Sequence, residues 1–326
     1  MGTDAGARRR HQSWWGLKRP VKRAVSLPGV NLLAHAVTAG ARGTDAAARL
    51  PAPMGVRKVQ GRIDDITYVM NDPAQCIIAK ELYWGDGRRP RAQDQFALDT
   101  FARLAQHADH VLDIGSYTGV FSVVAAKVNR AVAVEAFEIV PSNFLAAWGN
   151  VIANDLVGRI EVHLEGVGAE GVVRMPAATS GSALPDFWSI DDADDESGIR
   201  VPVSTLETVL ARSAERLEYD RRRILVKVDV EGHENDLVTA SADVIRADRP
   251  TFLMEILPDA DVAPLLEVFA RPGPDATGPY RYYVVTEDRL RERPTLTAER
   301  TYRDWLITTL VPDELTAVGI PTDELF

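Results

Sequence analysis

The sequence predicts an α/β fold built on a doubly wound, mostly parallel sheet. Short apolar runs, often rich in β-branched residues, alternate with segments of helical periodicity between residues 110 and 270. The run HVLDIG at 110–115 ends in Asp and Gly, and ILVKVDV at 224–230 is rich in β-branched residues. Strands that alternate with helices favour a parallel sheet covered on both faces.

The elements can be placed in order along the chain. We expect strands at 110–115, 131–138, 159–168, 224–230 and 251–256, and helices at 119–128, 142–153, 233–247 and 260–270. Ser142 follows Pro141 and is a candidate cap for the second helix. Two late strands, 280–286 and 305–310, have no long helix between them, which suggests an antiparallel pair at the end of the sheet.

The composition is globular, and the charge is unevenly spread. Hydrophobic residues make up 46% and charged residues 26% of the 326 residues, which excludes a disordered chain, a collagen or a coiled-coil rod. Residues 1–60 hold 11 lysines and arginines and two acids, a net charge of +9, whereas the whole chain carries −10. We therefore predict a basic arm and linker at 1–60 and a domain at 61–326, comprising an N-terminal cap at 61–105 and the core sheet at 106–326.

The same features bear on partners and location. The arm interleaves basic clusters with Trp14 and Trp15, so it is either a solvated terminus or a weak contact with an anionic membrane surface. The acidic body argues against a nucleic-acid partner. The single cysteine, Cys76, excludes an internal disulfide. No apolar run reaches the roughly 18 residues of a membrane span, and we expect a cytoplasmic protein.

A second biased stretch, 175–200, contains the acidic run 191–196. A calcium loop needs glycine at its sixth position, and counting from Asp192 that position is Ser197. We therefore interpret the stretch as a long exposed loop.

The turn after the first strand is the most informative segment. It reads D-x-G-x-x-x-G, with Asp113, Gly115 and Gly119. Glycines let the backbone approach a ligand and turn sharply into a helix. The third glycine of the dinucleotide fingerprint is missing, and no phosphate-binding loop is present. In open α/β sheets ligands bind outside the carboxyl ends of the strands, so the other strand ends are the next places to look.

Acids follow the second and fourth strands. Glu138 lies 19 residues beyond Gly119 and could accept hydrogen bonds from both ribose hydroxyls of a nucleoside, with Glu135 on the same strand as the alternative. At the fourth strand, alternation places Lys227, Asp229 and Glu231 on one side. His233, at the start of the next helix, could take a proton near neutral pH.

These motifs resemble a known family. VLDIGSYTG, AFEIVPSNF, VKVDVEGHE and FLMEI, in this order and spacing, are similar to the FkbM-type S-adenosylmethionine-dependent methyltransferases. The resemblance spans residues 63–256. It implies a seven-stranded, Rossmann-like class I methyltransferase sheet with a small N-terminal extension. Ile139 stands where the family usually has proline, and His233 stands where it often has a small residue.

The resemblance also implies the site. Asp113, Gly115, Tyr117 and Gly119 would line the methionine moiety of S-adenosylmethionine, and Glu138 rather than Glu135 would bind the ribose. Residues 165–167, with Glu165 and Val167 at the ends, would lie alongside the adenine. Asp229 and Glu231 would face the methyl group and the acceptor, which the family suggests is a hydroxyl on a sugar, glycolipid or polyketide-type small molecule.

Two mechanisms and two rival functions stay open. A base chosen from Asp229, Glu231 and His233 would take the proton of the acceptor hydroxyl. Alternatively, Asp229 and Glu255 could hold Mg²⁺ with oxygen ligands, although two carboxylates alone do not define a metal site. The rivals are a nicotinamide-dependent oxidoreductase, disfavoured by the missing glycine, and a non-catalytic scaffold held at membranes by the arm.

Overall fold

The computed structural model describes residues 52–53, 55–175, 198–215, 223–271 and 278–323, and six further residues between 24 and 36. It divides into two compact units, residues 1–62 with 69–91, and residues 63–68 with 92–326. The predicted boundaries at residues 60 and 105 stay predictions. In the described part of the chain, no helix is both long enough and apolar enough to cross a bilayer.

A hairpin and a short helix precede the large sheet along the chain. Strands β1 (Lys58–Ile63) and β2 (Ile66–Asn71) form a two-stranded sheet, and helix α4 (Ile77–Trp84) follows. Cys76 caps α4, because its Sγ accepts a hydrogen bond from the Ala79 amide at 3.3 Å. This cysteine is free and buried.

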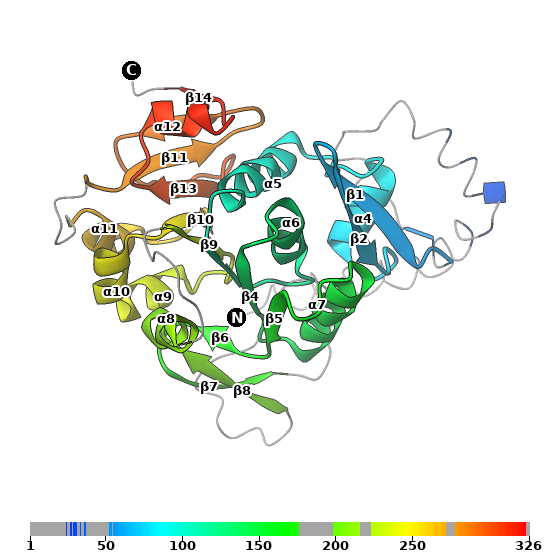
Figure 1. Cartoon of the computed structure of the whole chain (residues 1–326), viewed down its shortest axis with the longest axis horizontal. Coiled ribbons are helices and arrows are strands. Elements are labelled where there is room, and N and C mark those ends of the chain that lie inside the picture. Colours follow the sequence, from blue (N-terminus) through cyan, green and yellow to red (C-terminus); the bar gives the residue numbers. More distant parts are fainter. Residues whose placement is uncertain are drawn as a thin grey trace, which may run out of the picture. The chain divides into compact units, whose positions relative to one another are not determined.

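The second unit contains the large sheet (Figure 1). Its strands are β3 (His110–Ile114), β4 (Ala133–Phe137), β5 (Ile160–His163), β9 (Ile224–Val228), β10 (Thr251–Glu255), β11 (Arg281–Val285), β12 (Leu290–Arg293), β13 (Asp304–Thr308) and β14 (Thr322–Asp323). Their order across the sheet is β14-β12-β11-β13-β10-β9-β3-β4-β5. The five strands from β10 to β5 are parallel, and β13 and β11 are antiparallel to their neighbours.

Helices cover both faces of this sheet (Figure 1). One face packs against α8 (Leu206–Ala214), α9 (Glu234–Ala240), α10 (Ala242–Asp248) and α11 (Ala263–Phe269) in an apolar core that includes Leu112, Val226 and Phe252. Helices α5 (Ala92–Ala105), α6 (Val120–Val128) and α7 (Pro141–Ala153) lie on the other side, and α12 (Pro312–Ala317) precedes β14. Strand β9 is buried along its whole length, which matches its continuous apolar pattern.

The expected α/β class is confirmed, with a larger sheet. Seven strands, from β5 to β11, form the doubly wound sheet that the sequence predicts, with the late antiparallel pair β11 and β13 at its end. Strands β12 and β14 extend the sheet beyond β11, so that the described residues contribute nine strands instead of seven. Both added strands are short and polar, and their alternation is too brief to be recognised in the sequence.

The expected strand 159–168 is divided between two sheets. Residues 160–163 form β5, whereas β6 (Gly166–Val167) pairs with β8 (Ile199–Ser204), which also pairs with β7 (Gly171–Met175). The expected loop 175–200 thus begins and ends in paired strands, and its residues 176–197 lie outside the described residues. The split is invisible to a local pattern because the partner strand β8 is distant in the sequence.

Two helix predictions also need correction. The expected helix 233–247 is two helices that meet at Ser241, whose side chain accepts a hydrogen bond from the Leu206 amide at 3.0 Å. Ser142 does not cap α7, because that helix begins one residue earlier, with Val140 as its N-cap and Pro141 in the first turn. Proline is favoured there since its missing N–H has no partner within the helix.

Candidate functional site

Asp113 anchors the turn that follows β3 through hydrogen bonds to Ser122. One of its carboxylate oxygens, Oδ2, accepts hydrogen bonds from the amide of Ser122 at 3.0 Å and from its hydroxyl at 2.6 Å. Burial raises the pKa of Asp113 to about 6, although the two Ser122 hydrogen bonds oppose the shift. Asp113 therefore anchors the first turn of α6 to the end of β3, and it positions the turn that the family resemblance assigns to the methionine moiety.

Gly115 is required by the neighbouring strand. Its φ is +75°, and a Cβ there would lie 1.8 Å from the backbone carbonyl oxygen of Asp229. The close approach at this glycine is thus to the end of β9, which brings Asp229 against the turn. Tyr117 and Gly119 also have positive φ, of 49° and 75°. Asn150 of α7 secures the turn by donating a hydrogen bond to the Thr118 carbonyl at 2.8 Å.

Glu138 lies directly beyond β4, next to the same turn. It is buried, and its Oε1 accepts the Val140 amide at 2.7 Å. Burial raises its pKa to about 7, against the opposing effect of hydrogen bonds from the backbone of Val140, Tyr117 and Ile139. A carboxylate has about four acceptor positions, so these three bonds leave capacity for a ligand hydroxyl.

Glu135, the alternative on the same strand, belongs to a different network. Its carboxylate contacts His110 at 2.9 Å and the hydroxyl of Ser213 on α8. Burial raises the pKa of Glu135, but its interactions with His110, His163 and Ser213 outweigh burial and hold the pKa well below its ordinary value. Glu135 is thus committed within the sheet, whereas Glu138 stands at the strand's end.

The segment 165–167 is fixed by α8. Glu165 is buried, and its two carboxylate oxygens accept hydrogen bonds from Arg212, each at 3.1 Å. The hydroxyl of Ser204 also donates to it. Val167 is buried in β6, and a Cβ on Gly166 would lie 3.0 Å from Ile139. The segment therefore lies beside the residue that follows Glu138.

Charged residues gather where β9 and β10 end and β13 begins. Lys227 is buried, and its Nζ lies 3.8 Å from carboxylate oxygens of both Asp229 and Asp304. Burial lowers the pKa of Lys227, but the charges of Asp229, Asp304 and Glu255 outweigh this and raise it above its ordinary value. Lys227 is therefore a buried, protonated side chain next to Asp229 and Asp304.

Glu255 forms a pair with Asp229. Burial, the charge of Asp229 and a side-chain hydrogen bond between the two raise the pKa of Glu255 to about 9. The raised pKa favours a protonated Glu255 whose O–H donates to the carboxylate of Asp229, although Arg303 also lies 3.6 Å from the Glu255 carboxylate. The expectation that the ends of strands four and five bring these two residues together agrees with this geometry.

The other two candidate bases, Glu231 and His233, lie outside the charge cluster around Lys227. Glu231 is exposed and has a φ of +51°. His233 pairs with Asp236 of α9 through its Nδ1, at 3.1 Å. Alternation predicts Glu231 on the side of Lys227 and Asp229, but the chain turns at Glu231 after leaving the sheet. Among the three base candidates, Asp229 is therefore the residue that joins the buried charge cluster.

Asp304 is the site residue that the sequence pattern does not single out. It is the first residue of β13 and lies opposite Glu255 in the antiparallel register. An antiparallel strand begins at the edge where its parallel neighbours end, so an acid just before an expected late strand is a usable signal.

A family of known proteins matches the part of the chain that holds this site. Residues 113–271 match the family described as "Methyltransferase FkbM domain". This part of the chain, just under half of its length, is similar to FkbM methyltransferase domains. The family resemblance that the motifs predict is thus confirmed, and the match contains every one of the residues assigned to the site except Asp304. No curated protein matches the chain.

Solved structures of methyltransferases match the chain at low similarity. The methyltransferase FkbM from Methylobacillus flagellatus KT is 16% identical, with a TM-score of 0.38, over 62% of this chain and 44% of that one. A putative SAM-dependent methyltransferase from Streptococcus mutans is 12% identical, with a TM-score of 0.40, over 79% and 55%. This chain thus spans about half the length of these two proteins.

Proposed function

We propose that the protein is an S-adenosylmethionine-dependent O-methyltransferase that acts on a hydroxyl of a sugar, glycolipid or polyketide-type small molecule. One observation carries the proposal. Asp229 lies at the end of β9, against the Gly115 turn, and its carboxylate is paired with a protonated Glu255 above the buried Lys227. This arrangement offers a carboxylate beside the predicted cofactor turn, where an acceptor hydroxyl could be deprotonated.

The residues present fit the cofactor. Glu138 offers a buried carboxylate at the strand end for the ribose hydroxyls, and the Asp113 to Gly119 turn, anchored at Ser122 and Asn150, would hold the methionine moiety. Glu165 and Val167 would border the adenine. When bound, S-adenosylmethionine supplies an activated methyl group on its sulfonium.

The protein's part in the reaction is to orient the acceptor and remove its proton. A hydroxyl is a weak nucleophile until that proton leaves, and a positioned base contributes roughly 10²–10⁴-fold. Asp229 accepts the proton on a carboxylate oxygen. Glu255 donates its hydrogen bond to the same carboxylate, and the ammonium of Lys227 lies 3.8 Å from it, so Asp229 stays oriented toward the acceptor before the transfer. Glu231 and His233 stay secondary candidates at the rim.

The alternative is a Mg²⁺ ion held by the carboxylates. Asp229, Glu255 and Asp304 together offer the oxygen ligands that Mg²⁺ prefers. However, the ammonium of Lys227 already lies 3.8 Å from both Asp229 and Asp304. A buried cation at that distance repels a second one, so the geometry favours the base.

Substitution of Asp229 tests the proposal. Labelled S-adenosylmethionine is incubated with the protein and fractionated cell extract, and the methylated product is identified by mass spectrometry. Asp229→Asn keeps the shape of the side chain and removes its charge, so we expect turnover to fall at least roughly 100-fold while cofactor affinity is unchanged. Asp243→Asn, at an almost fully exposed acid on α10, is the matched control.

Chelation separates the two mechanisms in the same assay. With Asp229 as base, activity is indifferent to EDTA. With Mg²⁺, EDTA abolishes activity, added Mg²⁺ restores it, and Glu255→Gln is as damaging as Asp229→Asn. Full activity of Asp229→Asn would remove this residue from both mechanisms. Binding of NAD⁺ in place of S-adenosylmethionine would favour the oxidoreductase, and binding of neither would favour the scaffold.

A further inference from the structure

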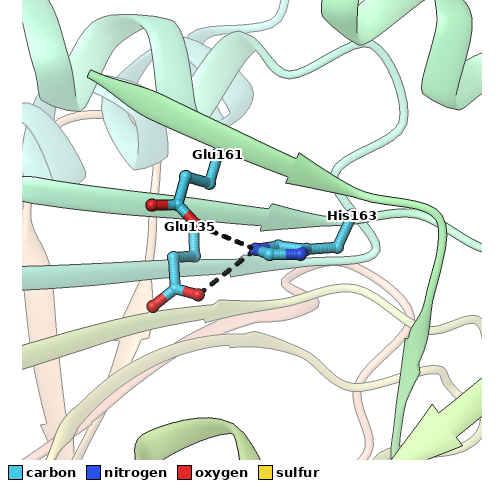
Figure 2. A group of neighbouring side chains, drawn as sticks. All are labelled: Glu135, Glu161 and His163. Carbon is cyan, nitrogen blue, oxygen red and sulfur yellow. Dashed lines mark ion pairs between the residues drawn. The ribbon is translucent and has the colours of Figure 1, made fainter. Parts of the chain in front are cut away.

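Three potential metal ligands meet on the face of the sheet that packs against α8, with His163 as the last residue of β5 (Figure 2). Glu135 of β4 lies opposite Glu161 of β5 in the parallel register, and His163 follows two residues later on the same side of β5. The Nε2 of His163 lies 3.2 Å from Oε2 of Glu135 and 3.9 Å from Oε2 of Glu161. Figure 2 shows both carboxylates directed at this one nitrogen.

The His163 Nε2 atom is the unusual member of the group. It is inaccessible to solvent and has no hydrogen-bond partner among the described residues. Its contact with Glu135 has the distance of an ion pair but not the direction of a hydrogen bond. Buried polar atoms in proteins are nearly always hydrogen-bonded, so a buried ring nitrogen that faces two carboxylates with poor hydrogen-bond geometry leaves a place for a ligand shared by the three groups.

The spacing of the three ligand atoms suits a small divalent ion. All three lie within 4.8 Å of one another. Zinc binds histidine nitrogen and carboxylate oxygen at about 2.0–2.2 Å, which places ligand atoms about 3.4 Å apart around a tetrahedron. The two distances to the His163 nitrogen, 3.2 and 3.9 Å, bracket that value.

The surroundings hold these ligands in place and leave a route to solvent. The ring of His163 stacks on Phe137, with centroids 4.7 Å apart and planes 15° from parallel. The second oxygen of Glu135 is fixed by His110 and Ser213, the kind of outer support that orients metal ligands. The side chain of Glu161 is half exposed, and that of His163 is 26% exposed, so an ion can enter from the edge strand.

We propose that Glu135, Glu161 and His163 bind a divalent zinc-class ion, with one nitrogen and two oxygen ligands and a water molecule in the fourth position. Imidazole suits zinc and its transition-metal neighbours, whereas Mg²⁺ selects sites made of oxygen alone. The site is separate from the Asp229 and Glu255 pair and does not depend on the proposed function.

Zinc titration of the full-length, tag-free chain tests this proposal. After removal of bound metal with EDTA and then of the EDTA itself, calorimetry with Zn²⁺ is expected to show one more zinc ion per wild-type chain than per His163→Ala chain. Glu161→Gln, at a half-exposed position on an edge strand, is expected to weaken that site at least roughly tenfold. His107→Ala, at an exposed histidine after α5, is the matched control and keeps the site.

Thermal unfolding of the same proteins guards against misfolded variants. Saturating Zn²⁺ is expected to raise the Tm of the wild-type and His107→Ala chains, because a ligand that binds only the folded state stabilises it. Without zinc, the Glu161→Gln chain should have the Tm of the wild type. With saturating zinc, its Tm should rise by less than that of the wild type. A wild-type chain that binds no zinc would overturn the proposal. Zinc binding that is unchanged in either His163→Ala or Glu161→Gln would do the same.

Discussion

Two glutamates, one in β4 and one just beyond it, show how neighbours decide what a carboxylate can do. Glu135 and Glu138 are three residues apart, and spacing alone cannot choose between them. Glu135 lies within the sheet and contacts His110 and Ser213, whereas Glu138 lies beyond the strand end and accepts backbone amides. The partners of Glu135 come from residues 25 and 78 positions away along the chain, which no local pattern reveals.

The raised pKa of Glu138 predicts a pH-dependent cofactor affinity. The ionised carboxylate is the form that accepts hydrogen bonds from ribose hydroxyls, and burial places its pKa at about 7. Affinity for S-adenosylmethionine should therefore be full above that pKa and fall as the pH drops from about 8 to about 6. Calorimetry at these two pH values measures the change, and Glu138→Gln should reduce it. An equal fall in Glu138→Gln would assign the titration to another group.

The close contact at Gly115 predicts an unequal effect of alanine at two glycines. Gly115 and Gly119 share a φ of +75°, so alanine costs each about 1–2 kcal/mol of backbone strain. At Gly115 the new Cβ would also lie 1.8 Å from the Asp229 carbonyl oxygen, whereas at Gly119 the nearest atom is 3.4 Å away. Gly115→Ala should lower the free energy of unfolding by at least about 2 kcal/mol more than Gly119→Ala.

Urea unfolding of both variants measures this difference. Equal midpoints would mean that β9 can move away from the turn at little cost, and that Gly115 does not fix the position of Asp229.

At the scale of elements, the sequence predicts strands well where burial is continuous. The runs at 110–115 and 224–230 are recognisable because β3 and β9 are buried throughout. The division of 159–168 between β5 and β6 is not, since the β8 partner of β6 lies more than 30 residues further on. Neither is the break at Ser241, which contains no glycine or proline and is fixed by a contact with α8.

The ion pair between β6 and α8 predicts a measurable loss of stability. Arg212 is 45% exposed but donates two hydrogen bonds to the buried carboxylate of Glu165. Arg212→Ala leaves that carboxylate without its cation, and we expect a loss of about 1–2 kcal/mol in the free energy of unfolding. Arg271→Ala breaks an exposed pair with Glu267 and should cost less than about 0.5 kcal/mol.

Denaturant unfolding of the two arginine variants makes the comparison. If Arg212→Ala were as stable as Arg271→Ala, the segment 165–167 would have another anchor, and Arg212 would have no share in shaping the proposed adenine border.

At the scale of the whole molecule, topology explains why much of the site can be anticipated. Parallel strands bring their carboxyl ends to one edge, so the alternation of strands and helices is enough to single out the ends of β3, β4, β9 and β10. Asp304 requires the antiparallel register of β13, and the burial of Lys227 requires the packed sheet. The pairing of protonated Glu255 with Asp229 depends on burial, which composition and spacing do not give.

The basic arm is predicted to be dispensable for the site. Every residue assigned to cofactor or catalysis lies beyond residue 105, in the second unit. Deletion of residues 1–50 should therefore leave a folded chain with wild-type cofactor affinity, measured by circular dichroism and calorimetry. If the arm binds anionic lipid vesicles, the intact chain should bind them more weakly as salt increases. The truncated chain should not bind them. An insoluble or unfolded truncation would show that the arm packs into the fold.

The most direct test is calorimetric titration of S-adenosylmethionine into the wild-type, Glu138→Gln and Glu135→Gln chains, with NAD⁺ titrated in parallel. The titration is done at about pH 8, above the raised pKa of Glu138. We expect the wild type to bind S-adenosylmethionine and not NAD⁺. Glu138→Gln should bind it roughly ten- to a hundredfold more weakly, because a charge-assisted hydrogen bond is worth about 1.5–3 kcal/mol, whereas Glu135→Gln should stay within a few-fold of wild type. Wild-type affinity in Glu138→Gln, or a wild-type chain that binds NAD⁺ instead, would contradict the account.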